Sequence, residues 1–122
     1  MSPATKPRDL AWAHQCVVRR VIDGDTVALD VLVDLNLVHV DDRLRILDVD
    51  TPEVSDILGP AATDFTRTWA SEHTALIVRT WKRDSFGRRL GYLIDRHTGE
   101  DLSEALTTVG LVVAAHLKEM AP

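Results

Sequence analysis

The alternation of hydrophobic and polar positions in the first half of the chain predicts three β-strands. A β-branched run over residues 15–22 leads into an Asp-Gly turn, and strand-forming residues resume over 26–33. The apolar stretch over 29–42 predicts an extended second hairpin with an exposed tip. A third main strand begins at Arg43 and ends at Asp50, close to a proline that has no amide to donate to a ladder.

The second half of the chain predicts a helix, two further strands and a second helix. Hydrophobic residues recur at helical spacing over 60–72, with proline in the first turn. Residues 74–82 and 89–95 are rich in strand formers and flank the loop DSFGR. Asp101 and the glutamate three residues later form a capping box for a helix over 101–109. This order favours a mainly β fold, a five-stranded OB-like antiparallel barrel with two packed helices.

Composition places this barrel in one domain. The chain has 122 residues, of which 45% are hydrophobic. We expect a flexible arm over 1–13, the barrel domain over 14–116 and a short tail over 117–122. The net charge of -5 disfavours nonspecific coating of a polyanion. The sequence shows neither a secretory signal pattern nor an apolar run of about 20 residues, so we expect a cytoplasmic protein without membrane contact.

Two acidic segments, VIDGDT and LDVDTPE, lie at the ends of predicted strands that a barrel brings together. Calcium prefers carboxylate, carbonyl and water oxygens, so Asp25, Asp50 and the backbone carbonyl of Thr51 form a reasonable partial shell. The alternative remains open, because Asp-Gly is an ordinary turn and Asp-Thr-Pro-Glu an ordinary strand end.

Arginines near these segments have the chemistry that phosphodiester cleavage requires. Arg45 lies on the same predicted strand as Asp50, and Arg88 follows the tight turn at Gly87, so each projects from a rigid element. Fixed guanidinium groups stabilise the negative charge of a pentacovalent transition state. Glu53 is able to position or deprotonate water, although an exposed loop glutamate is the ordinary interpretation. By composition alone, equally good candidates for the arginine role are Arg43, Arg83 and Arg89.

Five ordered segments together resemble the staphylococcal nuclease, or thermonuclease, family. They are VIDGDT, RLRILDVDTPE, GPAATDFT, DSFGRRLGY and DLSEALTTVGL, and they cover residues 15–115 approximately. The resemblance implies an OB barrel with packed helices. It also implies calcium-dependent cleavage of DNA and RNA phosphodiester bonds with little sequence specificity, leaving 3′-phosphate ends.

Carried over position by position, the resemblance implies a role for each candidate. Asp25 and Asp50 become ligands of one calcium ion, and Thr51 contributes its backbone carbonyl. Glu53 becomes the general base or water-orienting carboxylate. Arg45 and Arg88 bind the attacked phosphate, and Asp23 lies behind the ligands.

The chain also departs from the family pattern. Only VSDIL separates the TPE segment from Gly59, and the family's long third helix is absent, which leaves Leu111, Val112 and Val113 without an obvious cover. A homodimer formed through the 29–42 hairpin or this C-terminal surface is one consequence. The rival hypothesis is a noncatalytic nuclease-like barrel that binds a protein or a single strand.

Overall fold

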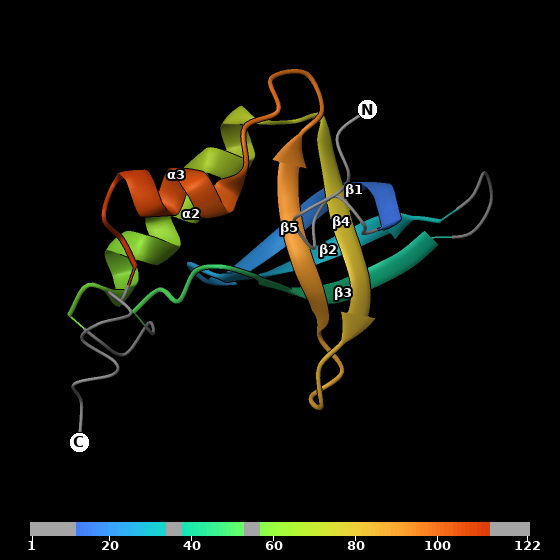
Figure 1. The fold of residues 1–122 in the computed structure, drawn as a ribbon, viewed down its shortest axis with the longest axis horizontal. Coiled ribbons are helices and arrows are strands. Elements are labelled where there is room, and N and C mark those ends of the chain that lie inside the picture. The colour runs from blue at the N-terminus through green and yellow to red at the C-terminus, as the bar shows by residue number, and fades with distance from the viewer. Residues whose placement is uncertain (1–11, 34–37, 53–56, 113–122) are drawn as a thin grey trace, which may run out of the picture.

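The computed structural model describes residues 12–33, 38–52 and 57–112, which form five strands and two helices (Figure 1). The predicted order of elements is confirmed. The elements are β1 (Trp12–Asp23), β2 (Thr26–Leu32), β3 (Val38–Ile46), α2 (Gly59–Glu72), β4 (Leu76–Arg83), β5 (Arg89–Asp95) and α3 (Leu102–Thr108).

The strands close into a barrel in the order β1-β2-β3-β5-β4, which confirms the OB-like architecture. Four of the pairings are antiparallel, but β3 pairs with β5 in parallel, with Arg45 opposite Leu90. The prediction of an antiparallel barrel was therefore wrong for the pairing of β3 with β5. The reason is geometric: strand directions cannot alternate all the way around a closed ring with an odd number of strands.

The third strand differs from its predicted bounds at both ends. Residues from Val38, which we assigned to a separate hairpin, belong to the same strand as Arg43, and the strand ends at Ile46 rather than Asp50. Asp48 adopts a left-handed backbone with φ 67°, which turns the chain away from the sheet. The guanidinium of Arg45 also donates to the carbonyls of Ile46 and Val49. These two carbonyls therefore accept a side-chain hydrogen bond in addition to any bond between strands.

Alternate residues of the strands fill the barrel interior. Val27, Leu29, Leu44 and Leu93 are fully buried, and Cys16 is a small buried hydrophobe whose pKa burial raises to about 12. Leu111 and Val112 are partly buried against this core. The expectation that they lack a cover from the same chain was therefore wrong, whereas Val113 lies outside the described residues.

The two helices lie together at one side of the barrel (Figure 1). Helix α2 packs on β1 and carries Trp69, which is buried, and α3 packs on α2 and β5. Asp101 is the N-cap of α3 and accepts a hydrogen bond from the amide of Ser103 at 2.8 Å, which confirms the predicted start of this helix.

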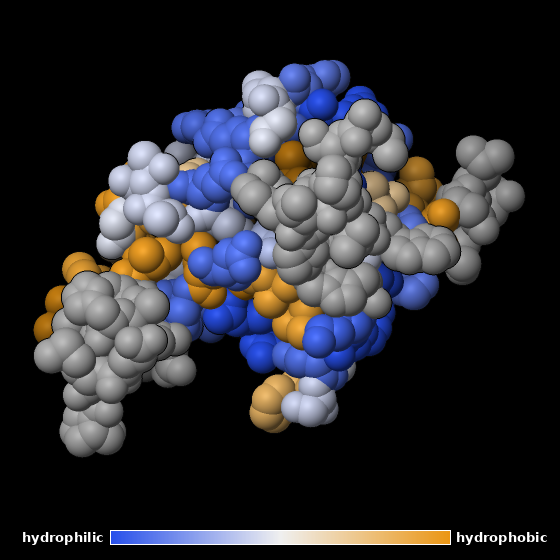
Figure 2. Space-filling model, in the orientation of Figure 1, coloured by the Kyte–Doolittle hydropathy of each residue, from blue (hydrophilic) through white to orange (hydrophobic). Residues whose placement is uncertain are grey.

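On the face in view, hydrophilic residues predominate and apolar residues show at several places (Figure 2). Exposed hydrophobic residues on either side of the predicted hairpin tip are Leu32, Val33, Val38 and Val40. The predicted tip, over 34–37, lies outside the described residues. Among the residues described, no helix is long and apolar enough to cross a membrane.

Candidate active site

The predicted acidic groups meet around the guanidinium of Arg45 on β3. Its Nη2 lies 3.4 Å from Oδ2 of Asp25 and 3.5 Å from Oδ1 of Asp50. Asp25 lies in the turn between β1 and β2, and Asp50 lies in the loop after β3, so closure of the barrel brings them together. Asp25 is almost buried, whereas the side chain of Asp50 is 38% exposed and gives the site an open side.

The turn that carries Asp25 is fixed by helix α2. Thr66 on the helix donates from Oγ1 to the carbonyl of Gly24 at 2.6 Å. A side chain at Gly24 would clash, because an added Cβ would lie 2.8 Å from Cβ of Ala62 and 2.9 Å from Oγ1 of Thr51. The close approach of helix and turn therefore requires glycine here.

The loop after β3 is fixed against the same carboxylate. The amide of Thr51 donates to Oδ2 of Asp25 at 3.0 Å, and Thr26 Oγ1 donates to Oδ1 at 3.1 Å. The Oγ1 atom of Thr51 is buried and has no hydrogen-bond partner within the described part of the chain. Thr51 thus meets Asp25 through its backbone amide, and the predicted role of its carbonyl as a calcium ligand stays a prediction.

Two anchors of this loop were not predicted. Tyr92 on β5 donates from its hydroxyl to Oδ2 of Asp48 at 2.8 Å, and Ser103 on α3 donates from Oγ to the carbonyl of Leu47 at 2.9 Å. Tyr92 stands in the predicted strand and Ser103 in the predicted helix. Their separation from the loop in sequence gives no signal that they hold it.

Arg88 lies in the loop before β5, beside the strand that carries Arg45. Its Nε donates to Oδ2 of Asp84 at 2.7 Å, and its Cζ lies 5.6 Å from the centre of the Phe86 ring. Arg88 comes directly before Arg89, where the ladder to β3 begins, and two residues before Leu90, which is opposite Arg45.

The structure distinguishes the five candidate arginines. Arg83 and Arg89 both bind the carboxylate of Asp42, at 2.8 Å and 2.5 Å, so their guanidinium groups serve an ion-pair cluster at the end of the barrel. Arg43 is exposed on β3. Arg45 is the one of the five that contacts both Asp25 and Asp50 within the residues described.

Two further residues of the predicted site are Asp23 and Glu53. Asp23 ends β1 and pairs with Thr26 across the turn, so it lies next to the site along the chain. Glu53 lies outside the described residues, and its predicted role as the general base stays a prediction.

Carboxylate and carbonyl oxygens are the ligands that a hard cation prefers. Asp25 and Asp50 both present a carboxylate oxygen to Nη2 of Arg45, so in this arrangement their negative charge faces the guanidinium. The described ranges hold no cluster of three or more His, Cys, Asp or Glu side chains suited to a metal ion. The remaining ligands would be the carbonyl of Thr51 and water molecules.

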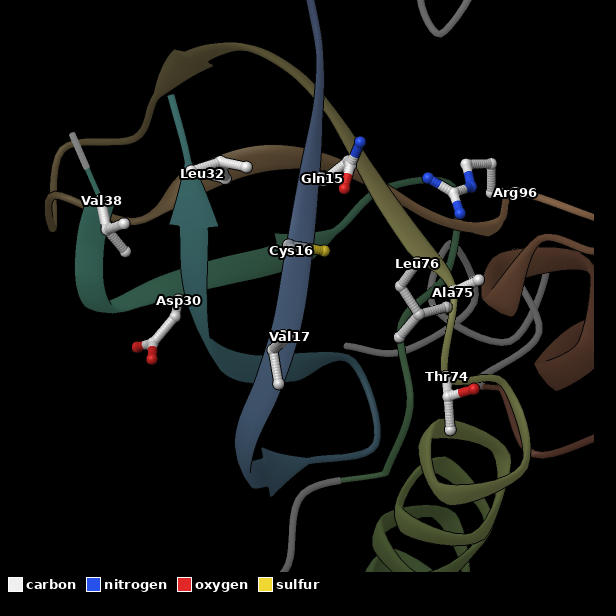
Figure 3. A pocket seen from close by; sticks show the side chains of 10 residues that line it. All are labelled: Gln15, Cys16, Val17, Asp30, Leu32, Val38, Thr74, Ala75, Leu76 and Arg96. Carbon is white, nitrogen blue, oxygen red and sulfur yellow. The ribbon is translucent and has the colours of Figure 1, made fainter. Parts of the chain in front are cut away.

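A pocket of about 370 Å³ lies elsewhere on the barrel and includes none of these residues. Figure 3 shows its lining, which comes from β1, β2, the start of β3, the segment that leads into β4 with the first residue of that strand, and Arg96 directly after β5. Cys16, Leu32 and Leu76 contribute apolar surface, and Asp30 and Arg96 contribute charge. The candidate active site therefore lies outside this pocket, at a turn, a strand end and the loop after it.

Comparison with known proteins agrees with this geometry at a coarse level. No protein-family model matches the chain. The chain is 33% identical over 84 residues to a protein named Thermonuclease from Staphylococcus intermedius, and the alignment covers 63% of this chain and 46% of the relative. The chain thus spans about half the length of the curated relative that it matches. These findings support at most a distant relationship to this thermonuclease.

Proposed function

We propose that the chain is a calcium-dependent nuclease that hydrolyses phosphodiester bonds of DNA and RNA with little sequence specificity and leaves 3′-phosphate ends. The observation that carries the proposal is the placement of Arg45 against both Asp25 and Asp50 at the end of the barrel. The similarity to a thermonuclease supports the same reaction class.

The carboxylates of Asp25 and Asp50 and the carbonyl of Thr51 would hold one Ca²⁺. The amide of Thr51 and the hydroxyl of Thr26 orient the Asp25 carboxylate by hydrogen bonds of 3.0 Å and 3.1 Å, which leaves further lone pairs on its oxygens for a cation. When bound, Ca²⁺ supplies positive charge that polarises the phosphate and lowers the pKa of coordinated water.

Arg45 and Arg88 would hold the phosphate that is attacked. In Arg88 the bond to Asp84 uses Nε, so Nη1 and Nη2 carry no hydrogen bond to any other described residue and are available to phosphate oxygens. In Arg45 the contacts with two carboxylates hold the guanidinium in place before substrate arrives. Positive groups fixed in this way stabilise the charge that develops in the transition state.

Glu53 would act on the attacking water. The water oxygen forms the new bond to phosphorus, its proton passes to the carboxylate of Glu53, and the bond from phosphorus to the 5′ oxygen breaks. The 5′ oxygen takes up a proton from solvent and leaves as a hydroxyl. The products are then a 3′-phosphate and a 5′-hydroxyl, which balances the addition of one water molecule.

Analysis of product ends tests this proposal. Purified protein is incubated with labelled single-stranded DNA, duplex DNA or RNA in calcium, in magnesium or with a chelator. We expect cleavage in calcium, with ends that a 3′-phosphatase converts but a 5′-phosphatase does not. Binding of the same oligonucleotides without cleavage in any metal would instead favour the noncatalytic barrel.

A further inference from the structure

One carboxylate on β3 binds two arginines of the neighbouring hairpin. Arg83 donates from Nη1 and Nη2 to the two oxygens of Asp42, each at 2.8 Å, and Arg89 donates from Nε to Oδ2 at 2.5 Å. The side chain of Asp42 is only 11% exposed. Burial alone would raise its pKa, but the two arginines outweigh burial and lower the pKa to about 2. The cluster is therefore ionised at neutral pH.

These arginines flank the loop that carries Arg88. Arg83 ends β4 and Arg89 begins β5, and Arg83 Nη1 also donates to the carbonyl of Gly87 at 2.9 Å. Within the loop, Asp84 accepts hydrogen bonds from the amides of Phe86 and Arg88, each at 2.9 Å. The loop is thus rigid internally and is attached at both ends to one carboxylate on β3.

The attachment matters because backbone pairing between β3 and β5 is short. The parallel ladder joins Leu44–Ile46 to Arg89–Gly91 and stops at Arg89, immediately after Arg88. Beyond that point, the described contact between β3 and the base of the hairpin loop runs through side chains, namely Asp42 with its two arginines and His39 at 3.0 Å from Nη2 of Arg89.

We propose that Asp42 is a positioning residue that fixes Arg88 relative to Arg45, so that both guanidinium groups reach one phosphate. This inference rests on the proposed nuclease function. Asp42 lies three residues before Arg45 on the same strand, and the loop of Arg88 is tied to it through Arg83 and Arg89. A misplacement of about 1 Å at a reacting centre can lower a rate about 100-fold, so such a tether has a large effect on turnover.

A double-mutant cycle separates positioning from general stability. The cycle compares kcat and KM for oligonucleotide cleavage in calcium by the wild type, Asp42→Asn, Arg88→Ala and the double variant. We expect Asp42→Asn to lower kcat by about 10- to 100-fold, and to have less than about a twofold effect once Arg88 is absent. An equal loss in both backgrounds, or no loss in either, would overturn the proposal.

Matched variants control for loss of stability. Asp95→Asn removes another almost buried carboxylate, which accepts hydrogen bonds from the amides of His97 and Thr98 at the opposite end of β5 from Arg88. It should leave kcat within about twofold at a temperature where it is folded. If Asp42→Asn does not fold, Arg83→Gln breaks the same tether at a side chain that is 42% exposed, and it should show the same dependence on Arg88.

A second readout does not need catalysis. In an NMR spectrum, nuclear Overhauser contacts between β3 and the residues that begin β5 report where the base of the loop lies relative to β3. We expect these contacts to weaken in Asp42→Asn and to stay unchanged in Asp95→Asn. Contacts that are unchanged in both variants overturn the positioning role even if the protein is a nuclease. A wild type that cleaves no substrate overturns the proposed function, and the NMR result then decides separately whether Asp42 orders Arg88.

Discussion

Arg45 and Asp25 are joined through side chain and main chain together. Nη2 of Arg45 lies 3.4 Å from Oδ2 of Asp25, and the amide of the next residue, Ile46, donates to the Asp25 carbonyl at 2.8 Å. The main-chain bond fixes the end of β3 against the turn between β1 and β2. The side-chain pair therefore forms between two backbones that are already in place, which lowers the entropy cost of holding a charged site ready for substrate.

The first prediction concerns the planar guanidinium groups of Arg45 and Arg88. Arg45→Lys and Arg88→Lys keep a positive charge but remove the bidentate geometry, so each should lower kcat by about 100-fold or more, while the unfolding transition stays cooperative. Single-turnover cleavage and urea denaturation measure the two effects. Arg67→Lys is the control, because Arg67 pairs with Asp64 on the exposed face of α2, and its turnover should match the wild type. Unchanged turnover in both active-site variants would contradict the assigned roles.

The second prediction separates water activation from metal binding. Glu53→Gln removes the proposed proton acceptor without removing Asp25 or Asp50, so the rate should fall by about 100-fold or more while calcium affinity changes little. Calorimetric titration with Ca²⁺ and a cleavage assay on the same samples measure both quantities. Full activity in this variant would move the base to another residue.

The third prediction concerns the close contact between the Asp25 turn and α2. Gly24→Ala should lower the free energy of unfolding by about 1–3 kcal/mol, because its Cβ would lie 2.8 Å from Cβ of Ala62. Urea denaturation measures the loss. Ala62→Gly removes the clashing atom. The double variant should therefore lose less free energy of unfolding than the two single variants lose when their losses are added. Strict additivity of the two losses would show that the contact is not the cause.

The fourth prediction concerns stability in acid. Hydrogen bonds from Thr98 and His73 lower the pKa of Asp95 to about 2, and the arginines at Asp42 outweigh its burial and give a pKa of about 2 as well. Both values lie below the unfolded reference of 3.8, so these carboxylates stabilise the fold above that pH.

This contribution should be lost progressively as the pH falls through about 4 towards 2. Asp42→Asn and Asp95→Asn should each flatten the pH dependence of the melting temperature over this range. A wild-type melting temperature that is constant from pH 5 to about 2 would contradict this linkage.

Local sequence signals were enough to predict most of the fold. Asp101 caps α3 as its position before an apolar face indicates, and the Asp-Gly turn at residues 23–24 joins β1 to β2. The end of β3 was not predictable in this way. The polar alternation continues to Asp50, and what stops the strand is a left-handed residue, Asp48, bonded to Tyr92 on another strand.

In the candidate site too, the residues in recognisable local segments were predictable, whereas the contacts between residues far apart in sequence were not. Asp25, Asp50 and Thr51 stand in recognisable turn and strand-end segments, and the structure brings them together. Composition could not separate Arg45 from Arg83 or Arg89. The distinction depends on Asp42, whose pairs with those two residues span 41 and 47 positions and form only when the barrel closes.

The central claim is tested most directly by calcium-dependent cleavage in the wild type and in Asp50→Ala, purified in parallel. Asp50 is exposed enough that its loss should leave the barrel folded, and a contaminating nuclease would be present in both preparations. We predict that the wild type cleaves DNA in calcium, that a chelator stops the reaction, and that Asp50→Ala lowers the rate by at least about 100-fold. Equal cleavage by both proteins, or none by a folded wild type in calcium, would contradict the assignment of this site to phosphodiester hydrolysis.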